Sequence, residues 1–498
     1  LHFSSMLLTL SIGILLLLVY AIIRYYRFVS RYPKGPTPLP FIGHFLEMDF
    51  ANQDKAYERL SEKFNDLCTI FFPFPVVHIK DYRLIREAFI EKGDDFVDRP
   101  QLRLIQLLRS FSDDGGVINS NGEIWREQRR TAISILRDFG MGKNLMEQLV
   151  NSSVSDYLKN LEEIEDHRNV NMRWPIQVMI ANIINELLFG FRYEYNNCDP
   201  LIRYVEDINA IMGNFAKNKL VLLGVGFPFL NKLPWIGYHT YQKHMDHARY
   251  INQYIVDSVD RAMKNYKEDE EPTCFVHAYK QRMTKNDRLD DPNLLTTCAE
   301  FFMAGQETTA TTLRWAMLIL TKHPEIQEKL RSEILSVVGR DRLPSLNDQN
   351  QMPYTRSVVH EVQRFANIVS TNGLRMTTRD TEVGGHFIPV GTIVNADIHY
   401  VMAHDPLFDN PHEFRPERYL SEDGKGLKKD LVDRTLPFSL GKRVCAGESL
   451  ARTELFLALA ATIQHYRLSS RPGQNIDLVS IPAPIKTPKE QNIIIERV

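Results

Sequence analysis

The sequence has few cysteines, and they do not form the pattern of a metal cluster or a disulfide framework. Its 498 residues contain five, at positions 68, 198, 274, 298 and 445, with no CxxC pair among them. An odd and scattered set argues against structural zinc and against disulfide stabilisation, and it favours a reducing compartment. Four of the five need no special role, whereas the surroundings of Cys445 set it apart.

A surplus of basic charge is also missing. The chain has 60 lysines and arginines against 62 aspartates and glutamates, for a formal net charge of -2. Proteins that bind nucleic acid usually carry a basic excess, so we expect no nucleic-acid partner. A content of 44% hydrophobic and 24% charged residues is typical of a globular protein with a large core.

One long apolar run stands at the N-terminus, where Met6 to Ile23 contains no charged residue. At about 1.5 Å per helical residue this run just spans a hydrocarbon core of ~30 Å. Basic residues follow it, among them Arg24, Arg27 and Lys34, which predicts an uncleaved anchor with the rest of the chain in the cytosol. The alternative, a cleaved signal peptide, would have its basic residues before the run and a small-residue cleavage site after it.

The chain after the anchor is predicted to be one body. A proline-rich segment, Pro33 to Pro40, forbids helix and favours a stiff extended spacer. No further linker or repeat follows it. We therefore expect a membrane anchor with its basic flank over residues 1–31 and a catalytic domain over residues 32–498.

The predicted fold of this domain is mainly α with a small β region. A long, largely apolar helix is expected over residues 294–322, and such a helix is typically buried. Strands are expected within residues 69–79, around a Phe-Pro-Phe-Pro break. A hairpin is expected within residues 381–394, with turns at the glycines.

Cys445 lies in a glycine-punctuated loop, PFSLGKRVCAG, directly before a stretch of helical composition from Glu448 to His465. Backbone N–H groups at a helix start lower the pKa of a thiol, and Arg443 adds positive charge two residues away. We therefore expect a stabilised thiolate at Cys445. The alternative is an inert thiol buried in the core.

This loop is similar to the haem-binding signature of the cytochrome P450 family, F-x-x-G-x-R-x-C-x-G, and it matches at every fixed position from Phe438 to Gly447. The resemblance implies the cytochrome P450 fold and a haem b (iron protoporphyrin IX) whose iron is bound by Cys445. A thiolate ligand donates electron density to the iron and favours O–O cleavage. Phe438, Arg443 and Gly447 would contact the cofactor.

Two further motifs of the same family are present. Glu361 and Arg364 match its E-x-x-R motif, and Arg418 lies in a Pro-Glu-Arg-Tyr segment with Tyr419 where the family has phenylalanine. The resemblance implies that Glu361, Arg364 and Arg418 form a buried structural triad. The alternative is a surface ion pair between positions i and i+3, worth only about 0.2–0.5 kcal/mol.

The carboxylates of a haem need cationic partners, and three positions resemble those of the family. Trp125 and Arg129 match a W-x-x-x-R motif, and Arg375 follows Arg364 at the family's spacing. The resemblance implies that these residues, with Arg443, bind the haem propionates. The alternative for Trp125 and Arg129 is a core tryptophan beside a surface arginine.

The segment from Ala304 to Thr309, AGQETT, matches the family's oxygen-activating motif within the long helix. The resemblance implies that the helix opens locally here. It also implies that Thr308 donates a hydrogen bond during oxygen activation and that Glu307 relays protons. The alternative for Thr308 is a hydroxyl bonded back to the carbonyl of Ala304, as is common for helical threonines.

Helical geometry predicts which other side chains share this face. At about 100° per residue, Phe301 and Ala304 fall within about 40° of Thr308, and Glu300 falls about 80° away. Phe301 and Ala304 would line a substrate pocket, unless Phe301 only packs between helices. Glu300 would meet a cationic substrate, or else bond to water or another helix.

The resemblance is closest to animal microsomal enzymes of the family-two type. It implies a monooxygenase that inserts one oxygen atom of O2 into a lipophilic small molecule, with electrons from NADPH through a flavoprotein reductase. Cytochrome b5 would be a further partner, and the endoplasmic reticulum membrane the location. A peroxide isomerase or lyase and a non-enzymatic haem sensor are alternatives, which the presence of both Glu307 and Thr308 disfavours.

A docking surface for the reductase would be basic. If the segment around Trp125 is helical, Arg126, Arg130 and Arg137 share one face, and such a patch would steer an acidic partner. The alternative is an ordinary solvated face.

Overall fold

The computed structural model describes residues 2–49, 52–64, 66–72, 74–101, 111–140, 144–240, 242–369, 372–481 and 483–498. Their contacts group the chain into two compact units. The first unit combines Leu1–Pro100, Thr371–Tyr400 and Leu440–Arg443, and the second combines Gln101–Ser370, Val401–Ser439 and Val444–Val498. The predicted boundary between residues 31 and 32 stays a prediction.

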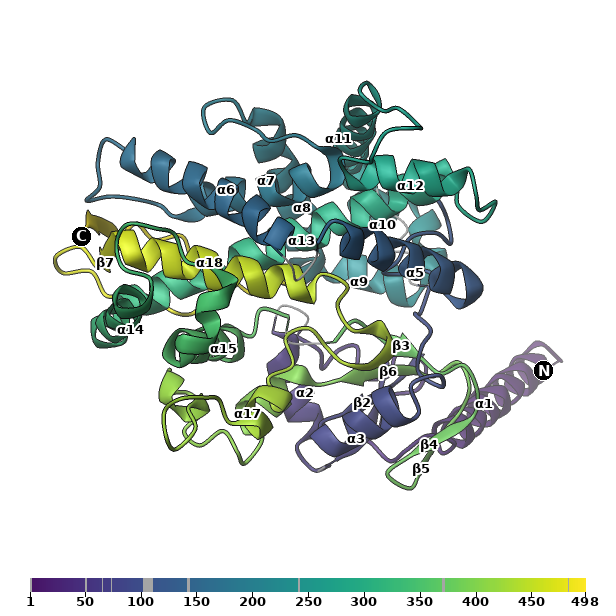
Figure 1. The fold of residues 1–498 in the computed structure, drawn as a ribbon. Coiled ribbons are helices and arrows are strands. Elements are labelled where there is room, and N and C mark those ends of the chain that lie inside the picture. The colour runs from purple at the N-terminus through teal and green to yellow at the C-terminus, as the bar shows by residue number, and fades with distance from the viewer. Residues whose placement is uncertain are drawn as a thin grey trace. The chain divides into compact units, whose positions relative to one another are not determined.

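The second unit is built around one long helix, α13 (Asp291–Lys322). The helix begins where the Asp290 carboxylate accepts a hydrogen bond from the Asn293 backbone N–H at 2.8 Å, a favourable N-cap. Figure 1 shows α13 among helices that pack against it, including α7 (Arg173–Phe189), α11 (Met245–Met263), α14 (Pro324–Val337), α15 (Pro353–Ala366) and α18 (Glu448–His465). The helix predicted over residues 294–322 is confirmed.

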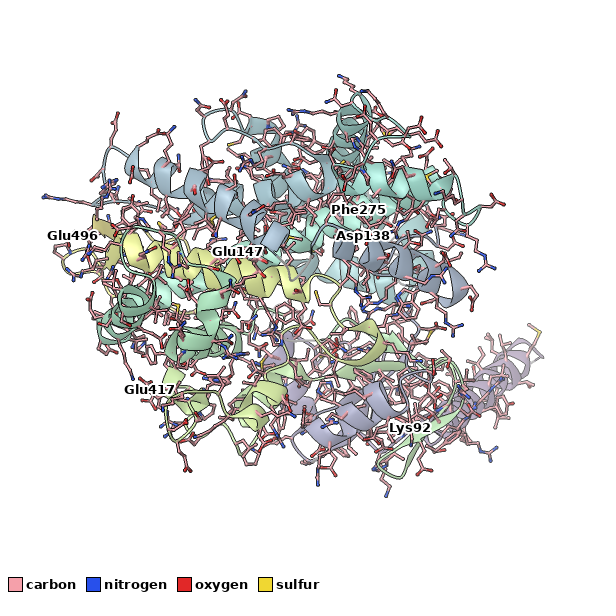
Figure 2. All side chains as sticks on the ribbon, in the orientation of Figure 1. Lys92, Asp138, Glu147, Phe275, Glu417 and Glu496 are labelled. Atoms are coloured by element: carbon pink, nitrogen blue, oxygen red, sulfur yellow. The ribbon has the colours of Figure 1, made fainter. Side chains whose placement is uncertain are left out.

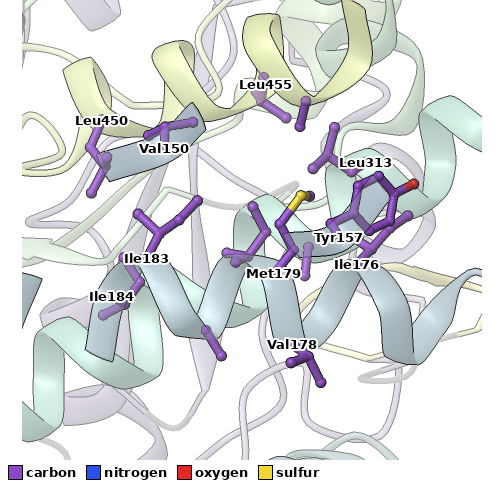
Figure 3. Packing of buried hydrophobic residues seen from close by; sticks show 14 of the residues in the cluster. Val150, Tyr157, Ile176, Val178, Met179, Ile183, Ile184, Leu313, Leu450 and Leu455 are labelled. Atoms are coloured by element: carbon purple, nitrogen blue, oxygen red, sulfur yellow. The ribbon is translucent and has the colours of Figure 1, made fainter. Parts of the chain in front are cut away.

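The core of this unit lies where α6 (Asn144–Glu162), α7, α13 and α18 meet. Figure 3 shows Met179 and Ile183 of α7 beneath Leu455 of α18, with Leu313 of α13 beside them, and all four side chains are buried. Helices α7 and α18 bury almost every side of their surface, so both are apolar nearly all round rather than along one stripe.

The remaining elements of the second unit surround this core. The other α-helices are α5 (Gly122–Asp138), α8 (Asp199–Lys217), α9 (Lys219–Gly226), α10 (Pro234–Thr240), α12 (Phe275–Met283) and α17 (Lys429–Arg434). The strands are β7 (Tyr466–Ser469), β8 (Ser480–Ile481), β9 (Thr487–Pro488) and β10 (Ile494–Arg497). Strand β10 pairs with β7 and β8 pairs with β9, both antiparallel.

The first unit contains a four-stranded sheet in the order β1 (Leu67–Phe72), β2 (Phe74–Ile79), β6 (Ile393–Ala396) and β3 (Arg375–Met376). Its strands consist largely of β-branched and aromatic residues and are mostly buried, as such residues favour. Strands β1 and β2 are antiparallel, and β2 runs parallel to β6. The strands predicted within residues 69–79 are confirmed.

The hairpin predicted within residues 381–394 is right in its first half. Strands β4 (Thr381–Val383) and β5 (His386–Ile388) pair across Gly384 and Gly385, which both have positive φ, as a tight hairpin turn requires. The second half was wrong, because Ile393–Ala396 leaves the hairpin and pairs with β2. The helices of the first unit are α2 (Gln53–Ser61) and α3 (Tyr82–Arg86), besides the N-terminal α1, and α16 (Ile398–His404) crosses from the first unit into the second.

Helix α1 (His2–Val29) carries the apolar N-terminal run. Its segment Met6–Val29 has a mean hydropathy of 2.7 and is not buried within the protein. A helix of this length and composition is able to cross a membrane. The predicted fold class, mainly α with a small β region and preceded by one such helix, is confirmed.

Candidate functional site

Cys445 lies three residues before the first residue of α18, whose N-cap is Gly447. Its backbone N–H donates to the carbonyl of Phe438 at 3.0 Å, which closes the loop. Among the five cysteines it is the exposed one, and the other four are buried. The cysteine that the sequence singled out is therefore the exposed one.

The expected lowering of the pKa of this thiol is wrong. Although the side chain has solvent access, the protein groups packed around it desolvate the sulfur and raise the pKa of Cys445. The backbone N–H groups of Gly447 and Glu448 lower the pKa, as expected, and so does the guanidinium of Arg129 rather than that of Arg443, but the desolvation outweighs them. A thiolate at this position therefore needs a further positive partner, such as a metal ion.

Arg129 reaches the cysteine loop from α5. Its Nη2 donates to the carbonyl of Val444 at 2.6 Å. Burial lowers the pKa of Arg129, and the charge of a Cys445 thiolate would raise it again. Trp125, one turn earlier on α5, is buried. The helix thus places a guanidinium beside the residue next to Cys445.

Arg375 and Arg443 lie in the first unit and hold the preceding part of the loop. Arg375 is fully buried, lies 3.7 Å over the ring of Phe89 and donates through Nη2 to the carbonyl of Leu440 at 2.6 Å. Arg443 donates through Nε to the carbonyl of Val97 at 2.7 Å. Both predicted cations are therefore fixed by protein carbonyls.

The glycines of the loop differ in what they require. Gly441 has a φ of +74°, and a Cβ there would lie 1.8 Å from the carbonyl oxygen of Phe89, so only glycine fits. Gly447 has a negative φ, and a Cβ there would meet nothing within 4 Å. The protein itself therefore gives no reason for glycine at position 447.

The donor groups suit a haem. A cysteine sulfur is a proven iron ligand, and the guanidinium of Arg129 suits a carboxylate. Open space at Gly447 leaves room for a flat group against the loop. Phe438 is half-buried, with the Arg452 guanidinium 4.9 Å over its ring.

The structure brings Glu361, Arg364 and Arg418 together. Arg364 binds the Glu361 carboxylate with two hydrogen bonds of 2.7 and 2.8 Å, and Arg418 donates to it at 3.0 Å. All three side chains are buried. The carboxylate also accepts the backbone N–H of Arg415 at 2.9 Å.

The remaining donors of both arginines bind backbone carbonyls. Arg364 reaches the carbonyls of Met402 and Pro411, and Arg418 reaches those of Asp409 and Glu413. Because the ion pair is buried and its donors are satisfied, the surface-pair alternative does not apply. The cluster fastens the segment from 402 to 418 onto α15.

Helix α13 runs without a break through the AGQETT segment, so the local opening that the resemblance implied is not present. The hydroxyl of Thr308 donates to the carbonyl of Ala304 at 2.8 Å, which is the back-bonded alternative. Thr312 makes the same bond to the carbonyl of Thr308 at 2.9 Å.

Glu307 is buried between α13 and α7. Burial raises the pKa of its carboxyl group, and the guanidiniums of Arg314 and Arg173 oppose that shift. Oε1 accepts from Thr311 at 3.3 Å, and Oε2 accepts from Gln177 at 3.5 Å. The carboxyl group therefore lies among polar groups on the α7 side of the helix.

One face of α13 is incompletely covered. Phe301, Ala304, Gly305 and Thr308 retain partial exposure, at helical spacing, along a helix that is otherwise largely buried. Phe301 packs edge-on against Phe275 of α12, which Figure 2 labels, with ring centroids 5.8 Å apart. Phe301 therefore takes part in interhelical packing and lies on the partly exposed face, while its role in a substrate pocket stays a prediction.

Glu300 binds the chain itself. Its Oε2 accepts the backbone N–H groups of Val117 at 2.5 Å and Ile118 at 2.8 Å. Asn293, two turns earlier, accepts the N–H of Gly116 at 3.2 Å. Glu300 was expected to meet a cationic substrate, or else water or another helix; the observed partner is the loop of residues 116–118, which Glu300 fastens to α13.

The arginines of α5 do not form a free basic patch. Arg126 pairs with Glu123 at 2.5 Å and Arg130 with Glu127 at 2.7 Å, each one turn away on the same helix. Arg137 is exposed. The alternative, an ordinary solvated face, describes Arg126 and Arg130 better.

Several buried charged residues were not predicted from the sequence, and Arg314 and Glu454 are two of them. Arg314 lies in the apolar second half of α13 near Glu307, and Glu454 lies in the apolar stretch of α18. Burial raises the pKa of Glu454 to about 8, and a hydrogen bond from Thr309 opposes this shift. A single charge inside an apolar helical stretch was the available signal in both cases.

The sequence was compared with known families and proteins. The model of the family described as Cytochrome P450 matches residues 33–494. Cytochrome P450 2E1 of Oryctolagus cuniculus is 34% identical over 467 residues, which cover 90% of this chain and 90% of that protein. Cytochrome P450 2D26 of Rattus norvegicus is 32% identical over 93% of this chain and 92% of that protein. Cytochrome P450 2C16 of Oryctolagus cuniculus is 32% identical over 89% of this chain and 88% of that protein.

Proposed function

Because this chain belongs to the cytochrome P450 family of monooxygenases, we propose that it inserts one oxygen atom of O2 into a lipophilic small molecule. The electrons would come from NADPH through a flavoprotein reductase. The observation that carries the proposal is the accessible Cys445 in its loop before α18.

Haem b, which membership of the family implies, supplies the redox chemistry that activates O2 when it is bound. Cys445 would bind its iron, and the loop of Phe438 and Gly447 would lie against the ring. Trp125, Arg129, Arg375 and Arg443 are the residues that membership of the family implies for the propionates. Glu361, Arg364 and Arg418 would support the loop region as a structural triad.

Glu307 and Thr308 would control protons on α13. A buried carboxyl group with a raised pKa holds a proton more readily at neutral pH than an exposed one, which suits a proton donor. The hydroxyl of Thr308 would leave the carbonyl of Ala304 to donate its hydrogen bond during turnover. That exchange costs one modest helical side-chain bond of about 0.5–1.5 kcal/mol.

The substrate would lie against the partly exposed stripe of α13. Phe301 and Ala304 make that stripe apolar, so we propose a lipophilic substrate. Glu300 would act on it indirectly, because its carboxylate holds residues 116–118 in place.

Helix α1 would anchor the enzyme in the endoplasmic reticulum membrane by a single pass. The basic flank after the apolar run, Arg24 to Lys34, favours a cytosolic catalytic domain. The same compartment would provide NADPH–cytochrome P450 reductase and cytochrome b5 as partners.

The proposal is tested with the purified protein, the reductase, NADPH and isotopically labelled dioxygen, over a series of lipophilic compounds. We expect NADPH oxidation that depends on the reductase, and a product that carries one labelled oxygen atom. A peroxide isomerase would form its product without NADPH, and a sensor would form none. Either result would contradict the proposed function.

A further inference from the structure

Glu307 belongs to a charged cluster that extends from α13 to the surface. Glu307, Thr311 and Arg314 lie on one face of α13, at positions i, i+4 and i+7. Arg173 and Gln177, one turn apart at the start of α7, pack against this face. Arg314 is buried, and the side chain of Arg173 is 20% exposed.

The outer end of the cluster is Glu490, in the segment between β9 and β10. Its carboxylate forms an ion pair with Arg173 and accepts from the Asn171 amide at 3.2 Å. Its side chain is 47% exposed, so this carboxylate meets solvent while that of Glu307 does not.

Backbone bonds on both sides fix the segment that carries Glu490. Before it, the carbonyl of Lys486 accepts the indole N–H of Trp315, the residue after Arg314, at 2.9 Å. After it, Ile493 and Val170 exchange both backbone hydrogen bonds at 2.9 Å, next to the start of α7. Glu490 is therefore held between the two helices that contribute the arginines.

The two acids share the same two cations. The pKa of Arg314 is lowered by burial and by Arg173, and it is raised by both Glu307 and Glu490. The guanidiniums stay protonated at any physiological pH, so they act as fixed charges and cannot pass a proton on. A charged Glu490 neutralises part of their field, which leaves less of it to stabilise an ionised Glu307.

Other charged groups near Glu307 and Glu490 interact with different partners. Lys489, next to Glu490, pairs with Asp477 at 2.6 Å. Glu454 of α18, which also packs on α13, interacts with Thr309. The field at Glu307 is thus set mainly by Arg173, Arg314 and, through them, Glu490.

We propose that Glu490, acting through Arg173 and Arg314, sets the charge state of Glu307 and with it the supply of protons to the segment around Thr308. This inference rests on the proposed function, because it assigns positioning residues to the same proton-handling group. In this proposal the exposed carboxylate of Glu490 controls the protonation of the buried carboxyl group of Glu307. When Glu490 is charged, Glu307 keeps its proton more readily.

The test uses two substitutions that break the same ion pair. Arg173→Gln removes a cation, so Glu307 should hold its proton to higher pH, by about one pH unit. Glu490→Gln removes an anion and frees the cations, so Glu307 should lose its proton at lower pH, by a smaller shift. A purely structural ion pair would give both variants the same defect.

The readout is the infrared band of the protonated Glu307 carboxyl group in the purified holoenzyme, assigned by its loss in Glu307→Gln and followed against pH. This titration needs no substrate or reductase, so it stays readable even if the proposed reaction fails. The solvent isotope effect on NADPH oxidation would follow the same order, smallest where Glu307 is most readily protonated.

The matched control is Glu162→Gln, which breaks the exposed ion pair at 2.9 Å between Glu162 and Arg497. Arg497, like Glu490, lies in the C-terminal part of the chain. Glu162→Gln should leave the band unmoved, and Arg173→Lys, which keeps the charge, should stay close to the wild type. Shifts in the same direction for Arg173→Gln and Glu490→Gln would overturn the proposal. So would a band that moves in neither variant, or the absence of any band that Glu307→Gln removes.

Discussion

The hydroxyl of Thr308 donates to the carbonyl of Ala304 at 2.8 Å, one turn earlier on α13. The bond satisfies the hydroxyl inside the helix and keeps it from any other acceptor. Thr312 repeats the arrangement one turn later, with its hydroxyl on the carbonyl of Thr308. The two threonines therefore make the same local bond, and they differ in that Thr308 lies on the partly exposed stripe whereas Thr312 is buried.

Thr308→Ala should uncouple the enzyme if the hydroxyl changes partners during turnover. General acid–base groups contribute about 10²–10⁴-fold, so product per NADPH should fall at least about tenfold, with hydrogen peroxide released instead. Thr308→Ser should retain coupling. The measurement is product and hydrogen peroxide per NADPH in the reconstituted enzyme.

Thr312→Ala is the matched control, because it removes the same kind of bond from the buried side of the helix. We expect it to remain coupled. If Thr308→Ala were also fully coupled, the hydroxyl would have only the structural role that its bond to Ala304 describes.

Glu361→Gln should destabilise the protein severely. The substitution keeps the shape of the side chain but removes the buried anion that the two guanidiniums share, and leaves Arg418 with its 3.3 Å ion pair to the largely exposed Asp409. We expect a cost of about 3–5 kcal/mol. The midpoint of thermal unfolding and the retained haem absorbance measure the effect. Glu163→Gln breaks an exposed i,i+4 pair with Lys159 and should change stability by less than about 0.5 kcal/mol. Equal effects of the two substitutions would show that the triad is no stronger than a surface pair.

Glu454 should make stability depend on pH. Burial raises the pKa of this carboxyl group to about 8 in the folded protein, above its ordinary value of 4.5. Between these values the folded protein keeps a proton that the unfolded chain releases. Stability is therefore highest below the lower value and is lost as pH rises towards the higher one, by at most about 1.4 kcal/mol per pH unit.

Glu454→Gln removes this proton exchange, so its stability relative to the wild type should rise with pH over that interval. Thermal unfolding midpoints of both proteins across the pH range measure the difference. A difference that stays constant with pH would mean that Glu454 is ionised in the folded protein.

Deleting residues 1–31 should release the protein from membranes and leave the haem spectrum intact. The deletion also removes Tyr25 and Phe28, whose rings lie 6.5 and 6.3 Å from that of Phe71 in β1. A shorter deletion, of residues 2–23, keeps these contacts and should release the protein equally well with less loss of stability. Fractionation with membranes and the absorbance spectrum measure both. Loss of haem from the shorter deletion would contradict the separation of anchor and catalytic body.

The sequence was most informative where a pattern depends on local structure. The long apolar run predicted α13, and the glycine pair predicted the turn between β4 and β5, because both depend on residues close together in the chain. The pairing of β6 with β2 joins residues more than three hundred positions apart, and no local pattern contains that partner.

The chemistry of single groups was harder to predict, because it depends on what packs around them. The position of Cys445 before α18 correctly predicted that backbone N–H groups lower its pKa, but not that Arg129 is the cation that assists them or that desolvation outweighs both. The position of Glu300 on α13 suggested an acid that binds substrate. Its carboxylate instead accepts hydrogen bonds from backbone N–H groups of a loop that lies 183 residues away in the chain. Arg314 and Glu454 drew no attention because neither belongs to a motif.

The central claim, that Cys445 provides the thiolate ligand of a haem, is tested most directly by the carbon monoxide difference spectrum of the reduced protein. The wild type should show the Soret band of a thiolate-ligated haem. Cys445→Ser should lose that band, because a serine oxygen is a harder and less donating ligand than sulfur. Cys298→Ser, which changes a buried cysteine of α13, should keep it. An unchanged thiolate-type band in Cys445→Ser would contradict the account.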